Sequence, residues 1–133
     1  MKCPACDELM IVLELEEIEI DYCTECEGIW LDGGELELLL EEVSEKEELL
    51  ASFKVDDSSG ETKIRCPICI KKMEKVLVGK ENKILLDRCK NHHGLWFNKG
   101  ELYEVVKLGS IDEENKILTL LKEIFKHKLT GGS

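Results

Sequence analysis

The amino-acid sequence predicts a small α+β protein built from two similar units, without one large hydrophobic core. Two observations lead to this expectation. Charged residues make up 35% of the 133 residues and aromatic residues only 5%, which leaves little bulky apolar material for a single core. Seven cysteines recur as closely spaced pairs, and the sequence around these pairs occurs twice. We therefore expect chemistry at the cysteines to supply much of the stability.

The cysteines fall into two sets of candidate metal ligands. In each set two residues separate the members of a pair, and 16 or 19 residues separate the two pairs. The first set is Cys3, Cys6, Cys23 and Cys26, and the second is Cys66, Cys69, Cys89 and one histidine. Disulfides would leave one of seven thiols unpaired, whereas two four-ligand sites use them all. Because thiolate pairs at this spacing suit a tetrahedral ion, we predict two structural zinc ions per chain, with iron as the alternative.

The fourth ligand of the second set is a choice between two adjacent histidines. The segment CTECEGIWLDGGEL, residues 23–36, aligns without gaps with CKNHHGLWFNKGEL, residues 89–102. This register matches His92 with Cys26 and keeps its distance to the tryptophan that follows. We therefore expect His92 rather than His93 to bind the metal.

Each unit is expected to contain a β-hairpin between its two ligand pairs. Residues 10–22 interleave apolar and acidic side chains in a rough period of two, which is typical of strands. In the second unit, residues 76–78 and 84–86 flank a turn sequence, Gly-Lys-Glu-Asn. An isolated hairpin is marginally stable in water, so tying both of its ends to one ion gives a physical reason for this arrangement.

A helix is expected to follow each second ligand pair. Asp32 and Asn98 are good N-cap residues, and Glu35 and Glu101 stand three residues later, as in a capping box. The first helix is predicted from residue 33 or 34 to about residue 50, and the second is short. These features together predict two tandem zinc ribbons, each a β-hairpin with zinc knuckles followed by an α-helix.

The chain then divides into four parts. We expect a first ribbon with its helix (1–50), a polar linker (51–63), a second ribbon with a short helix (64–108), and an additional C-terminal helix with a tail (109–133). The C-terminal helix carries one apolar stripe, formed by Ile117, Leu118, Leu120, Leu121, Ile124 and Phe125. That stripe could pack on its own unit, on the first helix or on a second chain.

Two further positions have specific expectations. Trp30 and Trp96 are expected to close a small core over the metal site and the hairpin, in preference to stacking on bases or peptides. Ile70 stands where the first unit has Asp7. A β-branched residue is strained there if the turn needs a positive φ.

The repeated strings resemble a known family. CPAC with CTECEGIWLDGGEL, and CPIC with CKNHHGLWFNKGEL, resemble the transcription factor zinc-finger family, which is named for its likeness to the zinc ribbon of transcription factor IIB. The resemblance covers both units and implies a zinc-binding fold, with a link to transcription by name only. It assigns metal binding to all seven cysteines, whereas His92 departs from the family pattern.

Charge is distributed unevenly along the chain, whose net charge is −11. Residues 1–63 contain four basic and 20 acidic residues, and residues 64–133 contain 14 basic and nine acidic ones. The acidic first unit should repel phosphate groups, so nucleic acid is a disfavoured partner. If it binds, we expect weak binding through basic residues of the second unit. Those residues are Lys71, Lys72, Lys75, Lys80, Lys83, Arg88 and Lys90. We expect a protein partner, either heterologous or a second copy joined through the helices.

Several classes of protein are disfavoured. Both sets of ligands are complete without water, so catalytic zinc is not expected, and no glycine-rich phosphate loop or nucleophile elbow occurs. We therefore expect a non-catalytic adaptor or regulatory protein. No apolar run is long enough to cross a membrane and no apolar leader precedes Cys3, so we expect a reducing cytoplasm, where thiols stay available for metal.

Overall fold

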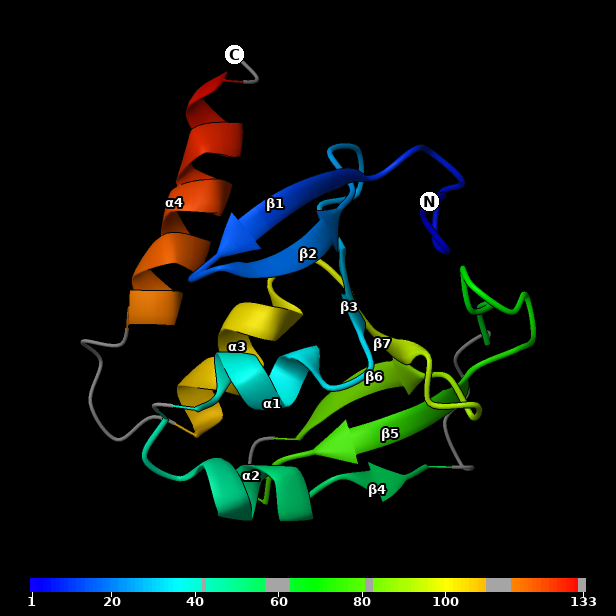
Figure 1. Ribbon diagram of the computed structural model, residues 1–133, viewed down its shortest axis with the longest axis vertical. Coiled ribbons are helices and arrows are strands. Elements are labelled where there is room, and N and C mark those ends of the chain that lie inside the picture. Colours follow the sequence, from blue (N-terminus) through cyan, green and yellow to red (C-terminus); the bar gives the residue numbers. More distant parts are fainter. Residues whose placement is uncertain (42, 57–62, 81–82, 110–115, 132–133) are drawn as a thin grey trace.

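One antiparallel sheet of seven strands forms the centre of the molecule (Figure 1). The structure, a computed structural model, describes residues 1–41, 43–56, 63–80, 83–109 and 116–131, with side chains as far as residue 124. The strands lie in the order β1-β2-β3-β7-β6-β5-β4. They are β1 (Ile11–Leu15), β2 (Ile18–Tyr22), β3 (Ile29–Asp32), β4 (Lys54–Val55), β5 (Glu74–Val78), β6 (Ile84–Arg88) and β7 (Gly94–Phe97). The helices are α1 (Glu35–Leu39), α2 (Lys46–Ala51), α3 (Glu101–Leu108) and α4 (Lys116–Gly131).

The sheet is assembled from two three-stranded units. The first unit is β1, β2 and β3, and the second unit is β5, β6 and β7. They meet through antiparallel pairing of β3 with β7, in which Trp30 lies directly opposite Trp96. Since these two tryptophans occupy the same place in the sequence repeat, the units are related by an approximate two-fold axis at this pair. The sheet is therefore continuous across both units.

The segment that the sequence predicts to be a linker takes part in this architecture. Residue 51 ends α2, and β4 adds Lys54 and Val55 to the outer edge of β5. Residues 57–62 lie outside the described residues. The polar composition of the segment therefore does not keep its first part out of the sheet, because the backbone of a short edge strand pairs whatever its side chains are.

The two hairpins match the expectation from residue patterning. β1 pairs with β2 through a two-residue turn at Glu16 and Glu17, whose φ angles are 51° and 67°. Such a turn matches the twist of the strands, but it needs two residues in the left-handed region, and glutamate is poorly suited to that. β5 pairs with β6 from Glu74 to Arg88 around a longer connection. The first hairpin therefore closes with strain that its sequence does not relieve.

Each face of the sheet has its own apolar cluster. On one face, strand residues pack with the helices in the larger cluster, which includes Ile29, Leu31, Val76, Leu86 and Phe97. On the other face both tryptophans pack with four buried cysteines, Met10 and Met73. Figure 1 shows the four helices on one side of the sheet and the N-terminal loop, with the loop before β5, on the other. The expectation that the tryptophans pack over the cysteines is confirmed.

The first helix differs from its prediction. A continuous helix to about residue 50 is wrong: α1 ends at Leu39 and α2 begins at Lys46. The break lets Leu40 and Val43 turn into the larger cluster, where both are at most 5% exposed. It also brings the backbone N–H of Glu45 to the carbonyl oxygen of Gly109, at 2.9 Å. Burial of these side chains outweighs the cost of ending a glutamate-rich helix.

The apolar stripe of α4 packs inside this chain. Ile117, Leu118 and Leu121 are buried in the larger cluster, and Lys116 forms an ion pair with Glu16 at 3.0 Å. Phe125 lies outside the described side chains. Among the described residues, no helix combines the length and the apolar character that crossing a bilayer requires.

Candidate metal centres

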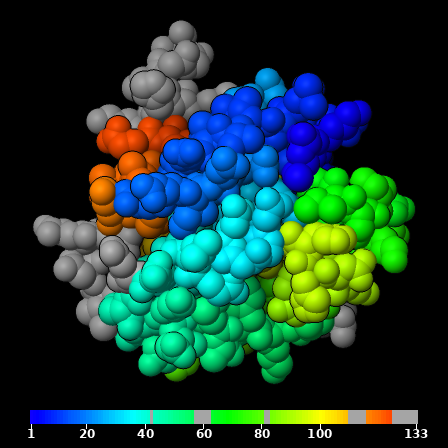
Figure 2. Space-filling model, viewed as in Figure 1, coloured from blue at the N-terminus to red at the C-terminus, as the bar shows by residue number. Residues whose placement is uncertain are grey.

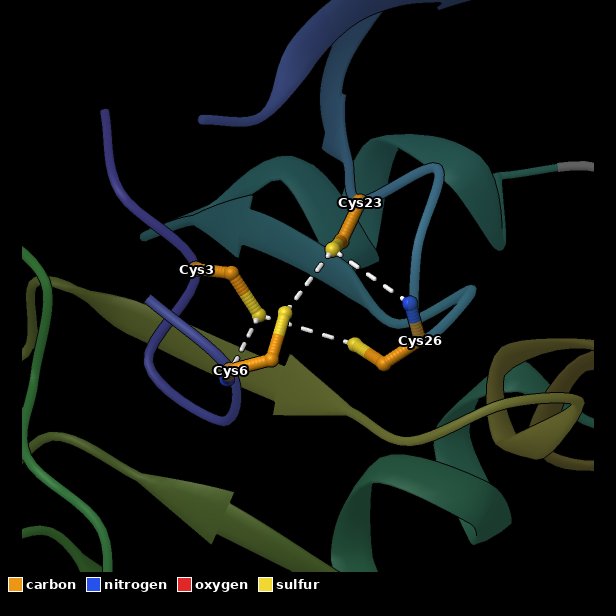
Figure 3. A group of neighbouring side chains, drawn as sticks. All are labelled: Cys3, Cys6, Cys23 and Cys26. Atoms are coloured by element: carbon orange, nitrogen blue, oxygen red, sulfur yellow. Dashed lines mark hydrogen bonds between the residues drawn. The ribbon is translucent and has the colours of Figure 1, made fainter. Parts of the chain in front are cut away.

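The first candidate metal centre is a group of four thiols from two loops. Cys3 and Cys6 come from the N-terminal loop, and Cys23 and Cys26 come from the loop between β2 and β3. Figure 3 shows the four side chains pointing toward one another. The Sγ atoms of Cys3 and Cys26 are 3.5 Å apart, those of Cys6 and Cys23 are 3.4 Å apart, and all four lie within 4.8 Å of one another. A zinc ion bound to four sulfurs at about 2.3 Å keeps them about 3.8 Å apart, so the donor set fits zinc.

Both loops hold their cysteines with the same local turn. After each second cysteine comes a residue with positive φ, Asp7 at 66° and Glu27 at 62°. Its backbone N–H donates to the carbonyl oxygen of the first cysteine of the pair, at 2.9 Å for Asp7 and 2.8 Å for Glu27. The turn leaves backbone N–H groups near the sulfur, and those of Ala5 and Cys6 both lie 3.4 Å from the Sγ of Cys3. Such N–H groups stabilise a thiolate.

The second candidate metal centre joins three cysteines and one histidine. Its members are Cys66, Cys69, Cys89 and His93, again with all ligand atoms within 4.8 Å of one another. The Nδ1 atom of His93 is 3.4 Å from the Sγ of Cys89 and 3.9 Å from the Sγ of Cys66. The Sγ atoms of Cys69 and Cys89 are 3.7 Å apart. Three thiolates and one imidazole are a common zinc donor set, so this group also fits the ion.

The expectation that His92 is the fourth ligand is corrected by this geometry. The loop after Cys89 closes one residue earlier than its counterpart, since the N–H of His92 donates to the carbonyl oxygen of Cys89 at 3.1 Å. His92 therefore takes the positive φ, 62°, that Glu27 takes in the first unit. Its side chain is exposed, and the next residue, His93, turns toward the thiols. The gapless alignment of the two sequence segments places the fourth ligand at His92. Because the turn in the second unit is one residue shorter, the ligand is the next residue, His93.

The Cys66–Cys69 loop repeats the first turn at a cost. Ile70 has a φ of 65°, and its N–H donates to the carbonyl oxygen of Cys66 at 2.9 Å. The expected strain at this β-branched residue is therefore present. The side chain is 59% exposed, so packing does not offset the strain.

Burial and hydrogen bonds divide the thiols of the first centre. Burial raises the pKa of Cys3 and the pKa of Cys26 above the usual range of a thiol. Burial alone would also raise the pKa of Cys23, but hydrogen bonds from the backbone of Cys26 and the thiol of Cys6 outweigh it, and the pKa is lowered. A bound cation would remove the cost of these buried thiolates by neutralising them.

The second centre shows the same division. Burial raises the pKa of Cys66 to about 11. A hydrogen bond from the backbone N–H of Lys71 lowers the pKa of Cys69 to about 6, with a smaller contribution from His93. Cys69 is thus readily available as a thiolate, the form that binds zinc.

In each unit, hydrogen bonds connect the tryptophan that packs over the thiols to the start of the helix that follows in the chain. The Nε1–H of Trp30 donates to Oδ1 of Asp32 at 2.9 Å, and the backbone N–H of Asp32 donates to Oε1 of Glu35 at 2.7 Å. Trp96, Asn98 and Glu101 repeat both bonds, at 3.0 and 2.7 Å.

The predicted capping boxes are therefore only half correct. Each glutamate reaches back to the backbone as expected, but the N-cap residues are Gly34 and Gly100, without a side-chain cap. The Asp32 and Asn98 side chains bind indole rings instead. The signal for this was the spacing of two between Trp30 and Asp32, which places both side chains on one face of a strand.

Lys75 is another residue whose role sequence reasoning missed. The sequence suggested a phosphate contact, but Lys75 is 6% exposed and its Nζ lies 2.7 Å from Oδ1 of Asp87, which is 1% exposed. The two residues are cross-strand partners on β5 and β6. Lys75 is thus part of a buried ion pair. Its partner, Asp87, can be identified only from the pairing of β5 with β6, which the sequence alone does not give.

Comparison with known proteins supports the first centre directly. The sequence model of one protein family, described as transcription factor zinc-finger, matches residues 2–42, which contain all four ligands of the first centre. No curated protein and no solved structure matches the chain. Residues 2–42 thus match a zinc ribbon of the transcription factor IIB type, and a second group of ligands able to hold a metal ion lies at residues 66–93.

Proposed function

We propose that this protein is a non-catalytic adaptor that binds two zinc ions and contacts another protein through a rigid surface supported by them. The observation that carries the proposal is the pair of four-ligand groups on one face of a continuous sheet. The proposal includes a second zinc ribbon at residues 64–108, because β5, β6 and β7 repeat the register of the first unit. Structural zinc would fix the loops whose turns hold the thiols.

The ligand count favours a structural role over catalysis. Each centre is filled by four protein side chains, so zinc bound there keeps no open position for an activated water molecule. When bound, the ion supplies neutralisation of the thiolates and a rigid link between two loops. The protein residues then orient that link: Trp30 and Trp96 cover the thiols, and the N–H groups of the turns stabilise the sulfurs.

Native mass spectrometry of the intact chain tests the metal part of the proposal. We expect two zinc ions per chain, and oxidised or metal-free chains would contradict it. The adaptor part predicts a complex of fixed stoichiometry with a polypeptide, without turnover. Recovery of a defined product from a small-molecule substrate, lost on substitution of a residue near either centre, would contradict a non-catalytic role.

A second candidate function is weak binding of nucleic acid by the second unit. It is favoured by the exposure of Lys71 and Lys72, which follow the Cys66–Cys69 loop. Lys75 cannot contribute, because it is buried against Asp87. Fluorescence anisotropy with RNA, single-stranded DNA and duplex DNA would then show binding that falls steeply with salt. The variant Lys71→Glu/Lys72→Glu should abolish it, and no binding at low salt would exclude this function.

A further inference from the structure

The two units differ at their outer edges. In the second unit, β4 covers the outer edge of β5, with Lys54 opposite Leu77 and Val55 opposite Val76. In the first unit, β1 is the last strand of the sheet, and no described strand pairs with its outer edge. The N-terminal part of the chain, blue in Figure 2, lies at the surface on the face shown there. Val12 is 60% exposed there and Ile11 is 46% exposed. An exposed edge with apolar side chains is an established template for another strand.

The register shows which backbone groups of β1 face outward. Val12 pairs with Asp21, and Lys75 pairs with Asp87, so Val12 occupies the place of Lys75 in the approximate two-fold. The carbonyl oxygen of Lys75 accepts a hydrogen bond from the N–H of Asp56, at 2.9 Å, on the outer edge of β5. Val12 and, two residues on, Glu14 therefore direct their backbone groups away from β2.

The N-terminal residue already uses the start of the same edge. The N–H of Met10 donates to the carbonyl oxygen of Met1 at 2.9 Å. Ile64 is the counterpart in the second unit, where it accepts from the N–H of Met73 at 2.8 Å. The edge of β5 is thus covered at both places, and the edge of β1 at one of them. No described backbone group pairs with the outer edge around Val12 and Glu14.

We propose that the outer edge of β1 is a strand-addition site, which binds an extended segment of a partner protein in which basic and apolar residues alternate. The segment runs antiparallel to β1, as β4 runs against β5. This proposal rests on the adaptor function and names the surface and the chemistry of its partner. Main-chain bonds to Val12 and Glu14 provide affinity, and the alternating side chains provide selectivity.

The two faces of β1 determine the alternation. Glu14 lies beside Glu19 on one face of the sheet, whereas Leu13 and Leu15 point to the face of the larger cluster. Lys54 stands opposite Leu77, the counterpart of Glu14. A lysine of the partner segment that paired with β1 in this way would lie opposite the carboxylate of Glu14. The apolar residue next to that lysine would lie opposite Leu13, on the face of the larger cluster. The 20 acidic residues among residues 1–63 also attract a basic segment.

A second copy of this chain is a poor occupant of the edge. The one charged residue of β1 is Glu14, and pairing β1 with β1 of another copy would bring together two chains that each carry a net charge of −11. Like charges across a strand pair destabilise it. Charge therefore favours a basic partner over self-association.

The test uses the zinc-loaded full chain, labelled with ¹⁵N and with any affinity tag at the carboxyl end. The probe is a capped hexapeptide of alternating lysine and valine. Two control peptides replace lysine by glutamate or carry N-methyl groups on alternate amides, which removes the bonds of one edge. We expect the probe to slow amide hydrogen exchange at Val12 and Glu14, and we expect both controls to bind at least tenfold more weakly.

Two variants of the protein locate the site. Val12→Pro removes an outward N–H and leaves the bonds to β2 in place, so it should weaken the probe at least tenfold. Val12→Thr keeps the N–H and the branched shape and should bind as the wild type does. If Val12→Pro fails to fold, the N-methylated peptide still tests the backbone bonds.

The remaining outcomes overturn the proposal. These are probe binding that leaves Val12 and Glu14 unprotected, equal binding of the glutamate peptide, and a dimer that protects Val12 without peptide. Native mass spectra of the same samples separate the two proposals. Chains without zinc would contradict the proposed function, whereas zinc-loaded chains that bind no probe would contradict this inference alone.

Discussion

The indole ring of Trp96 fills the space that a side chain at Gly28 would need. An added Cβ at Gly28 would overlap Cζ2 and Cη2 of that ring. The same relationship exists in reverse, because a Cβ at Gly94 would lie 2.6 Å from Cζ2 of Trp30. Each unit thus provides a glycine on which the tryptophan of the other unit packs. The two units therefore share their cysteine-side core.

This relationship predicts a large effect of a single methyl group. Gly28→Ala should lower the free energy of unfolding by about 2 kcal/mol or more, because a rigid ring must move. In a Trp96→Phe background, where the shorter ring leaves room, the same substitution should cost less than half as much. Urea denaturation at a fixed excess of free zinc measures both values. Gly34→Ala is the control, since a Cβ there meets nothing within 4 Å and only its φ of 90° causes strain. Equal costs in both backgrounds would contradict direct packing.

The adjacent histidines predict different metal contents. His93→Ala should reduce bound zinc from two ions per chain to one, because it removes a ligand atom 3.4 Å from the Sγ of Cys89. His92→Ala should retain two ions, since its side chain is exposed. Native mass spectrometry after dialysis against a weak chelator gives the counts. The reverse pattern would show that the loop after Cys89 closes differently from the structure.

The buried ion pair predicts a cost that depends on both partners. Lys75→Met leaves the carboxylate of Asp87 buried without its cation, so it should destabilise the protein by about 3 kcal/mol. Adding Asp87→Leu should recover much of that loss, because neither charge then remains buried. Thermal unfolding of the zinc-loaded chains compares them. Lys72→Met, at an exposed position, should change stability by at most about 0.5 kcal/mol.

The strained turn at Ile70 predicts a stabilising substitution. Asparagine adopts positive φ more readily than a β-branched residue, so Ile70→Asn should raise the free energy of unfolding by about 1 kcal/mol. The lost side chain is 59% exposed and contributes little burial. Ile68→Asn in the same loop is the matched control and should give no gain. A loss of stability at Ile70→Asn would mean that its exposed side chain makes a contact worth more than the strain.

The turn between β1 and β2 predicts a second gain. Glu16→Asn together with Glu17→Gly should stabilise the chain by about 1 kcal/mol, because this pair is preferred where both residues have positive φ. This expected gain is a net value: it already allows for losing the exposed Lys116–Glu16 ion pair, which costs at most about 0.5 kcal/mol. Glu16→Gln isolates that cost, and chemical denaturation measures all three chains. If the paired substitution behaved like Glu16→Gln alone, the backbone would not be strained.

Local signals in the sequence were sufficient for the loops and hairpins and insufficient for the way the units join. Cysteine spacing gave the first group of ligands, and residue alternation gave both hairpins. The pairing of β3 with β7 was not predictable, because four residues such as Ile29–Asp32 show no period and could equally lead into a helix. The choice between His92 and His93 depended on the length of the turn after Cys89, which is one residue shorter than the turn after Cys23. A sequence alignment without gaps does not show this difference.

Because β3 pairs with β7, the sheet cannot be completed until both units have been synthesised. The ribosome adds residues from the amino end, and domains generally fold in that order. The first unit has all its zinc ligands once Cys26 has emerged, but its β3 edge has no partner until residues 94–97 follow. For about 65 residues of synthesis, a few seconds at typical elongation rates, the nascent chain presents an open edge beside Gly28 and Trp30. Until β7 follows, the edge of β3 is therefore open to pairing with strands other than its native partner.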